Sequence, residues 1–302
     1  MDISRRSFLT VGAVGAAGAL GARTMAMAAP GSNFSFVHFT DVHIQPELRA
    51  DVGSRACMAR INALKPDFAI CGGDLVFDVN AGVAPRAKQL FDLYGETVKP
   101  LNMPVHSVVG NHDVYGISSN SGVPQSDPSY GKRMFEDRIG ARYSSFDYKN
   151  WHFVLLDSIG SKAGREFIGL VDDEQLAWLR TDLKQMKPGS SLVVVSHIPL
   201  VSSVLQLVAD PGRAADIYLV TNARDVLEVL WPFRPRMVLQ GHTHIRETVS
   251  YNGCRFITSG AVCGNWWKGP REGHPEGFGV LTVRGNAIEW RYETYGFVAD
   301  RT

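Results

Sequence analysis

The sequence predicts a single layered α/β domain, and two observations support this. Short apolar runs alternate with longer amphipathic segments along most of the chain, which is the pattern of strands alternating with helices. The composition is that of an ordinary globular protein, because 45% of the residues are apolar and 20% are charged. We see no internal repeat, low-complexity tract or linker, so residues 29–302 are expected to form one domain.

The expected elements follow from the apolar pattern. Six runs of four to eight residues, most of them rich in Val, Ile and Phe, predict β-strands at 34–40, 67–71, 105–109, 151–157, 191–196 and 236–240. Five segments between them predict helices at 47–64, 85–98, 130–139, 172–186 and 222–230. Asp172 and Asn222 are favourable N-cap residues for the last two helices. The tail, residues 253–295, predicts three more strands without helices.

Three connecting segments are long, polar and rich in Gly, Pro and Ser: 115–129, 199–212 and 263–277. Loops of this length inside a compact domain are usually functional or mobile. Plain surface decoration is the alternative reading of each of them.

The first 28 residues have the organisation of an export signal. Arg5 and Arg6 precede Phe-Leu, a Gly/Ala-rich apolar run follows, and small residues end at Ala28. This resembles a twin-arginine signal, which implies the twin-arginine machinery as a partner, cleavage after Ala28 and a periplasmic or secreted protein. The apolar run is shorter than the roughly 20 residues that span a bilayer, so no stable membrane anchoring is expected.

Charge and cysteine content exclude little. The formal net charge is +1, which gives no electrostatic reason to expect a nucleic-acid polymer or an anionic membrane as a partner. The four cysteines form no Cys-x-x-Cys pair and are expected to be buried thiols. A disulfide between Cys254 and Cys263 is the alternative.

Polar residues with metal-binding side chains follow five of the predicted strands. These residues are Asp41 and His43, Asp74, Asn111 to Asp113, His197, and His242 and His244. Ligands bind at the carboxyl ends of strands in open α/β sheets, and five of the nine histidines lie in these positions. Imidazole and carboxylate together suit Zn, Mn or Fe, and a carboxylate between two cations can bridge them.

Local geometry gives two further expectations for these strand ends. Residues two apart in an extended segment point the same way, so Asp41 and His43 are expected to hold one ion. Glycines beside the polar residues are expected to let the backbone turn sharply under the ions; these are Gly72, Gly73, Gly110 and Gly241.

The blocks Asp-x-His, Gly-Asp, Gly-Asn-His-Asp, His and Gly-His-x-His occur in this order between Asp41 and His244. The series resembles the signature of the calcineurin-like metallophosphoesterase family. It spans about two-thirds of the chain. The resemblance implies two facing mixed β-sheets flanked by helices, an αββα sandwich, and two divalent transition-metal ions. One ion would be bound by Asp41, His43, Asp74 and His244, and the other by Asp74, Asn111, His197 and His242, with Asp74 bridging.

The resemblance also implies a reaction. Two ions bind phosphate oxygens and activate a bridging water, whose hydroxide attacks phosphorus. His112 is expected to contact the phosphoryl group and to protonate the leaving alkoxide. Asp113 is expected to orient the His112 imidazole. The purple branch of the family has Asp and Tyr where this chain has His43 and Phe77, so the sequence resembles the non-purple, phosphodiesterase-like branch.

Candidate substrate contacts lie in the loops after the ligands: Tyr115, Trp266, Trp267 and Arg271. The alternative is that the tryptophans close a core or another loop. Three other histidines lie inside predicted strands and match no block of the series, so they are expected to be surface or capping residues: His38, His106 and His152. The loop residue His274 is left without a prediction.

The sequence therefore predicts a two-metal hydrolase of a small phosphate ester, with a phosphodiester preferred as the substrate. A phosphomonoester and a nucleotide or pyrophosphate are the alternative substrates for the same site. A non-catalytic metal-binding protein of the same fold is the rival from another class, and nothing in the sequence indicates an oligomeric state.

Overall fold

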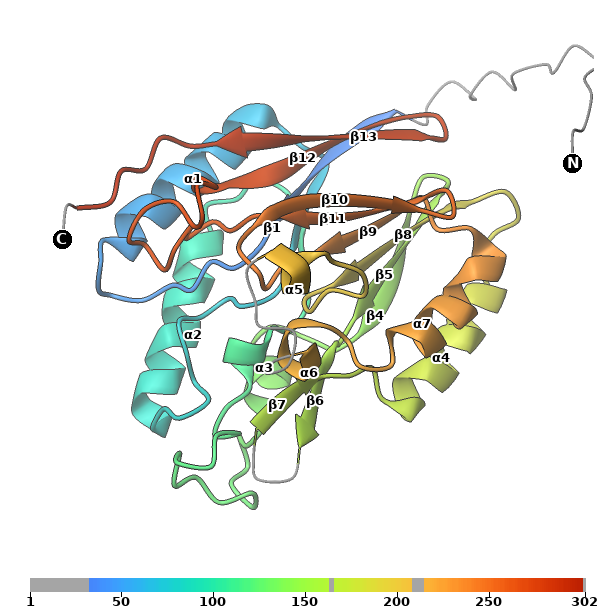
Figure 1. Ribbon diagram of the computed structural model, residues 1–302. Coiled ribbons are helices and arrows are strands. Elements are labelled where there is room, and N and C mark those ends of the chain that lie inside the picture. The colour runs from blue at the N-terminus through green and yellow to red at the C-terminus, as the bar shows by residue number, and fades with distance from the viewer. Residues whose placement is uncertain (1–32, 163–165, 208–214, 301–302) are drawn as a thin grey trace, which may run out of the picture.

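The computed structural model describes residues 33–162, 166–207 and 215–300. Two β-sheets face each other, with helices on the outer side of each sheet (Figure 1). This confirms the predicted αββα architecture. The export signal expected at residues 1–28 lies outside the described residues.

The first sheet has the strand order β13-β12-β1-β2-β3. Its strands are β1 (Phe34–Phe39), β2 (Phe68–Cys71), β3 (Val105–Ser107), β12 (Gly277–Arg284) and β13 (Ala287–Thr294). The first three run parallel, whereas β12 pairs antiparallel with β1, placing Val37 opposite Val280. The carboxyl ends of β1, β2 and β3 consequently meet at one edge of the sheet.

The second sheet has the order β10-β11-β9-β8-β5-β4. Its strands are β4 (Ser144–Tyr148), β5 (Trp151–Leu156), β8 (Ser191–Ser196), β9 (Met237–Gln240), β10 (Arg246–Tyr251) and β11 (Cys254–Ser259). The four central strands are parallel, and the edge strands β4 and β10 are antiparallel to their neighbours. A separate hairpin pairs β6 (Ile159–Lys162) with β7 (Glu166–Gly169).

Two helix pairs cover the outer faces. Helices α1 (Ala50–Leu64) and α2 (Ala84–Val98) contact each other beside the first sheet, and α4 (Asp173–Lys184) and α7 (Ala223–Leu230) do so beside the second (Figure 1). The remaining helical segments are short: η1 (Asn111–Asp113), α3 (Arg133–Arg138), α5 (Val204–Leu207), α6 (Ala215–Tyr218) and η2 (Trp231–Phe233). No helix among the described residues has the length and apolar character needed to cross a membrane.

The predicted helix caps have different outcomes. The Asp172 carboxylate accepts a hydrogen bond from the Gln175 amide at 2.8 Å, which confirms it as the N-cap of α4. Asn222 precedes α7 but makes no side-chain cap. Its amide instead pairs with both backbone groups of Val171. A side chain engaged in this way cannot also satisfy the first turn of α7, so the predicted capping role of Asn222 is wrong.

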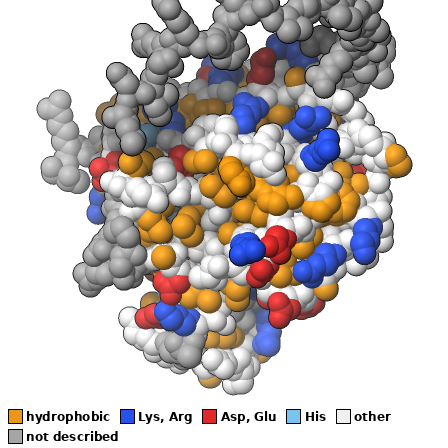
Figure 2. Space-filling view, turned by 45° about the vertical axis from the view of Figure 1, so that its right-hand side comes forward, with side chains coloured by type: hydrophobic (Ala, Val, Ile, Leu, Met, Phe, Trp, Pro, Cys, Tyr) orange, Lys and Arg blue, Asp and Glu red, His pale blue; other side chains and the backbone are white. Residues whose placement is uncertain are grey.

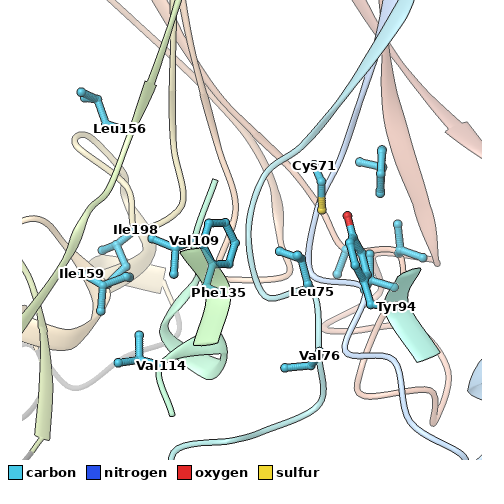
Figure 3. Close-up of a cluster of buried hydrophobic side chains, with 14 of the residues drawn as sticks. Cys71, Leu75, Val76, Tyr94, Val109, Val114, Phe135, Leu156, Ile159 and Ile198 are labelled. Atoms are coloured by element: carbon cyan, nitrogen blue, oxygen red, sulfur yellow. The ribbon is translucent and has the colours of Figure 1, made fainter. Parts of the chain in front are cut away.

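The core has two parts because the central strands are apolar on both faces. Alternate residues of β5 illustrate this, since Trp151 and Phe153 fill the space between the sheets whereas Val154 packs toward the helices. Figure 3 shows side chains of the helix-side core, in which Tyr94 of α2 meets Cys71 of β2. Two-sided burial of this kind fixes strand register, because a shift by one residue would exchange the two faces.

The sequence-predicted strands and long helices are all present, and three strands follow residue 253 as expected. Four strands were missed: β4, β6, β7 and β10. The reason is physical, because edge and hairpin strands bury few residues and lack a continuous apolar run. All four cysteines are free and buried, so the expectation of buried thiols is confirmed and the alternative disulfide is not formed. On the face shown in Figure 2, basic and acidic side chains are interspersed around apolar ones.

Candidate metal centre

The strand ends bring the seven predicted ligands to one place between the two sheets. The loops after β1 and β2 are joined by backbone hydrogen bonds from Asp41 to Gly73 and from His43 to Asp74, both 3.0 Å. The Gly241 amide donates to the His197 carbonyl at 3.0 Å, which joins the loops after β8 and β9 in the same way. These hydrogen bonds therefore hold together loops whose predicted ligands lie far apart in the chain.

Five of the seven predicted ligands have a left-handed backbone: Asp41, His43, Asp74, His242 and His244, with φ between 43° and 72°. Non-glycine residues rarely adopt this conformation, and it concentrates at functional sites. The expectation that Asp41 and His43 converge because their segment is extended is wrong. Left-handed residues on either side of Val42 bring the two side chains together instead.

The glycines have two different roles. Gly73, with φ +98°, provides the expected sharp turn. Gly110 is needed for close approach, because a Cβ there would lie 2.1 Å from the Asp74 backbone nitrogen. Of the four predicted glycines, only Gly73 has a positive φ. Turns also begin at Gly110 and Gly241, whose carbonyls accept from the Asp113 amide at 3.2 Å and the Thr243 amide at 2.8 Å.

One group of ligand atoms lies around His43 and His244. Their Nε2 atoms are 3.1 Å apart. The carboxylate of Asp41 is 3.3 Å from His244 Nε2, and that of Asp74 is 3.4 Å from His43 Nε2. All four side chains are buried. They form the first of two adjoining ligand sets.

The second set lies around His197. Its Nε2 is 3.0 Å from Asn111 Oδ1 and 3.2 Å from Asp74 Oδ2, and the His242 ligand atoms lie close to those of Asp74 and His197. The same oxygen of Asp74 therefore faces both sets, since Oδ2 is also the atom near His43. Its other oxygen, Oδ1, accepts the His112 amide at 2.8 Å. Among the described residues, Asp74 is the carboxylate that belongs to both groups of ligand atoms.

Backbone carbonyls fix the direction of three of the imidazoles. Nδ1 of His43 faces the Phe77 carbonyl at 3.3 Å, that of His197 faces Gly72 at 2.9 Å, and that of His244 faces Gly264 at 2.6 Å. A carbonyl only accepts, so Nδ1 carries the proton and Nε2 turns toward the centre. Partners of this kind set the tautomer of metal-binding histidines.

The residues fit a pair of divalent ions. Ligand atoms about 2.0–2.2 Å from one ion lie roughly 3 Å from each other, which matches the spacings above. Lone pairs and carboxylate oxygens facing each other at these distances repel unless a cation or proton lies between them. Neutral imidazole with carboxylate and amide oxygen suits a borderline transition-metal ion.

The pKa shifts show the same convergence of charge. Burial acts to raise the pKa of Asp41, but the neighbouring His244 and His197 outweigh it and lower that pKa to about 2. Burial lowers the pKa of His43 to about 3, and that of His242 likewise. Burial also acts to lower the pKa of His197, but Asp74 outweighs it and raises that pKa to about 9. A cation entering the centre therefore meets neutral imidazoles at His43 and His242 and competes with a proton at His197.

His112 lies beside this cluster and is partly exposed. The carboxylate of Asp113 contacts backbone amides and not the His112 ring. The Asp113 carboxylate accepts three backbone amides, from Leu75 at 2.9 Å, Val76 at 3.1 Å and Gly110 at 2.8 Å. These bonds clamp the loop after β2 to the turn at η1. The expected orienting contact with His112 is not among them. The residue facing His112 Nδ1 is Asp78, at 3.8 Å.

The four candidate substrate contacts divide into different environments. Trp266 covers the cluster, with its ring centroid 4.0 Å from that of His43 and 5.0 Å from that of His112. Arg271 is half-buried and donates to Asn265 Oδ1 at 3.2 Å. Tyr115 and Trp267 are 2% and 1% exposed and pack in the core. The expected substrate contacts of these two residues are therefore wrong, since a substrate cannot reach either ring.

The other histidines have partners outside the ligand sets, and the expectation that His38 and His152 lie at the surface is wrong, because both are buried. His38 bonds Ser259 across the sheets at 2.7 Å, His106 stacks on Phe146, and His152 lies between two carboxylates. His274, which had no prediction, accepts from Arg246 at 3.3 Å in its loop. None of the four is in the ligand sets.

Several residues near the centre were missed from the sequence. Asn80 donates to the carbonyls of Asn111 and Val114 and so holds the η1 turn. The rings of Phe167 and Tyr218 lie 6.3 Å and 5.7 Å from that of His242. Cys263 Sγ is 3.7 Å from His244 Nδ1. No sequence signal marked them, because each belongs to a segment that only folding brings to the strand ends.

The fold and the family model together place the chain among the metallophosphoesterases. The family model described as calcineurin-like phosphoesterase matches residues 34–246, more than half of the chain. The chain belongs to the calcineurin-like phosphoesterase family.

Curated relatives are distant. The 3',5'-cyclic adenosine monophosphate phosphodiesterase of Haemophilus influenzae is 25% identical over 200 residues, which is 65% of this chain and 61% of that protein. The manganese-dependent ADP-ribose/CDP-alcohol diphosphatase of Mus musculus is 24% identical over 225 residues, covering 57% and 61%. The matched region thus spans about 61% of the length of each. A dimetal phosphatase from Danio rerio shares the fold, with a TM-score of 0.60 at 19% identity over 88% of this chain and 100% of that one.

Proposed function

We propose that this protein is a phosphodiesterase that uses two divalent transition-metal ions. The observation that carries the proposal is the single oxygen of Asp74 that faces both ligand sets, 3.4 Å from His43 and 3.2 Å from His197. When bound, such an ion pair supplies Lewis-acid activation of the phosphate and of water. Similarity to a cyclic-nucleotide phosphodiesterase supports a diester substrate.

The chain's own residues would divide the work as follows. The seven ligands hold the ions, and the carbonyls behind His43, His197 and His244 keep their rings in place. His112, 22% exposed at its side chain, lies beside the ligands and delivers a proton to the departing alkoxide. Trp266 limits access of water above His43.

A substrate screen tests the proposal directly. The protein loaded separately with Mn²⁺, Zn²⁺ or Fe²⁺ is assayed on bis(4-nitrophenyl) phosphate, 4-nitrophenyl phosphate, cyclic AMP and ADP-ribose. We expect higher kcat/KM on a diester than on the matched monoester. A monoester preference with every metal contradicts the diesterase assignment.

Hydrolysis of a nucleotide pyrophosphate is the second candidate, favoured by similarity to the ADP-ribose/CDP-alcohol diphosphatase. The same ligands would serve that reaction, since both substrates present a phosphate oxygen to the ions. ADP-ribose turnover above that of every diester in the screen would select it. A non-catalytic role would appear as two bound ions with no turnover of any ester.

We further propose that the chain is exported by the twin-arginine route and acts in the periplasm or outside the cell. Arg5 and Arg6 before an apolar segment and a small-residue site at Ala28 support this. Arg5→Lys with Arg6→Lys should leave the precursor in the cytoplasm, measured by fractionation. Arg23→Lys is the control, and normal export of the double variant would contradict the proposal.

A further inference from the structure

A cavity of about 480 Å³ lies next to the metal centre. Its lining includes Asp78 and Asn80 from the segment after β2, Ser118 from the loop after η1, and Glu166, Phe167 and Ile217 from the β6–β7 hairpin and α6. A drug-sized or smaller ligand fits a cavity of this volume.

Two contacts join this cavity to the reacting end of the site. Asp78, on its wall, is 3.8 Å from Nδ1 of His112. Phe167, on the same wall, has its ring centroid 6.3 Å from that of His242. On the other side of His112, Trp266 already covers the ring of His43. The Nδ1 edge of His112 therefore lies behind Asp78, next to the wall of the cavity.

The departing alcohol must lie beside the residue that protonates it. In hydrolysis, a water oxygen forms a bond to phosphorus, the bond from phosphorus to the alcohol oxygen breaks, and the alkoxide takes a proton. With His112 as the proton donor, the alcohol occupies the neighbouring cavity.

The charges of the cavity wall favour one kind of alcohol. Asp78 and Glu166 are acidic, and no Lys or Arg is among the described residues that line it. Lys162 lies opposite Glu166 in the β6–β7 hairpin and pairs with Asp216 at 2.6 Å, so this one cation is shared between two carboxylates. The Phe167 ring adds an aromatic face, which attracts cations through its quadrupole. A second phosphate or a carboxylate would meet two like charges at this wall.

We propose that this cavity binds the departing alcohol of a phosphodiester and selects a cationic amino alcohol over an anionic one. The inference rests on the proposed phosphodiesterase function and adds the chemical class of its substrate. Glu166 and Asp78 are the specificity-determining residues, and Phe167 provides the apolar wall.

The test compares three methyl phosphodiesters of similar size, formed with 2-aminoethanol, 1-propanol and 3-hydroxypropanoate. Metal-loaded protein is assayed for kcat/KM on each, and the released alcohol is identified by chromatography. We expect release of 2-aminoethanol to exceed that of 3-hydroxypropanoate by about tenfold at low salt, with the preference shrinking as salt rises. Glu166→Gln should lower this ratio about threefold, whereas Glu96→Gln, on the distant helix α2, should leave it unchanged.

Binding gives a second measurement that does not depend on turnover. Calorimetry with the metal-loaded His112→Ala variant should rank the three esters in the same order. A ratio of one or less in the unaltered protein, or a ratio insensitive to Glu166→Gln, overturns the proposal. If no diester in either screen is hydrolysed, the phosphodiesterase function fails and this inference fails with it.

Discussion

The histidines at the strand ends and His152, inside β5, have opposite surroundings in this protein. The imidazoles of His43, His197 and His244 have a carbonyl behind Nδ1 and only acceptors or another imidazole before Nε2. His152 has a carboxylate at each nitrogen, Asp147 at 2.7 Å and Asp182 at 2.9 Å. The strand-end rings are thus arranged for a cation that comes from outside. His152 already has its complementary charges within the fold.

The contrast gives a criterion that residue type alone does not provide. A buried histidine whose two nitrogens are both satisfied by oppositely charged or polar partners is structural. A buried histidine that points its lone pair at other acceptors needs a ligand, because leaving those groups unpaired in a low-dielectric interior is costly. The predictions below test this difference, beginning with the largest effect.

Removal of the shared carboxylate should have the largest effect. Asp74→Ala should lower metal content from about two ions per chain to below one, since its Oδ2 faces both ligand sets. Activity should fall to background. Elemental analysis and assay measure both, with Asp92→Ala, an exposed carboxylate on α2, as the control. Two retained ions in Asp74→Ala would contradict the bridging role.

Catalysis should be separable from metal binding at His112. His112→Ala should keep both ions, because the ring lies outside the ligand sets, and should lower kcat by roughly 10²–10⁴. The loss should be smaller for a nitrophenyl ester than for an alkyl ester, whose alkoxide needs protonation. An equal loss on both esters would assign His112 to charge stabilisation instead, and loss of an ion would make it a ligand.

The architecture, and the convergence of the residues predicted as ligands, were accessible from the sequence because each has a periodic or positional signal. Apolar runs predicted the buried strands, and the polar blocks after them coincide with the strand ends that meet between the sheets. Side-chain direction beyond a strand end had no such signal. It depends on single φ angles, such as 55° at Asp41 and 43° at His43, which sequence does not display.

The same limit explains the wrong expectations for Tyr115 and Asp113. Tyr115 follows the Gly-Asn-His-Asp block, yet its backbone pairs with Gly131 and its ring points into the core. Asp113 is adjacent to His112, yet the 3-10 turn directs it to amides of the preceding loop. Neighbours in sequence therefore lie on opposite sides of the turn. Asp78, 34 positions earlier in the chain, faces the imidazole.

The two adjacent tryptophans provide a comparison of core and site within one loop. Trp267→Ala should destabilise the fold by about 3–5 kcal/mol, because its buried ring packs against Phe297 and donates to the His43 carbonyl. Trp266→Ala should cost less than about 1.5 kcal/mol and change KM instead. Denaturant unfolding and kinetics measure the pair. A larger stability loss for Trp266→Ala would reverse the assignment.

The smallest effect concerns the pH dependence of stability at the two structural histidines. Burial acts to lower the pKa of His152, but Asp182 and Asp147 outweigh it and raise that pKa. Its stabilisation is therefore fully present below the unfolded pKa of about 6.5 and is lost as pH rises through the folded pKa. His152→Gln should lower the free energy of unfolding by about 1 kcal/mol at pH 5.5 and by less at pH 9. The effect is small because Asp147 is partly exposed, and solvent screens its charge.

His106 is the matched control, because burial alone lowers its pKa. A lowered histidine pKa has the opposite sign: stability is present above the unfolded pKa and is lost as pH falls below it. His106→Gln should therefore be better tolerated at pH 5.5 than at pH 9, relative to the unaltered chain. Urea unfolding of both variants at the two pH values measures these opposite changes in the free energy of unfolding. If the two variants show the same pH dependence of stability, the carboxylates beside His152 contribute only packing. The charge of the partner would then not distinguish a structural histidine from a metal-binding one.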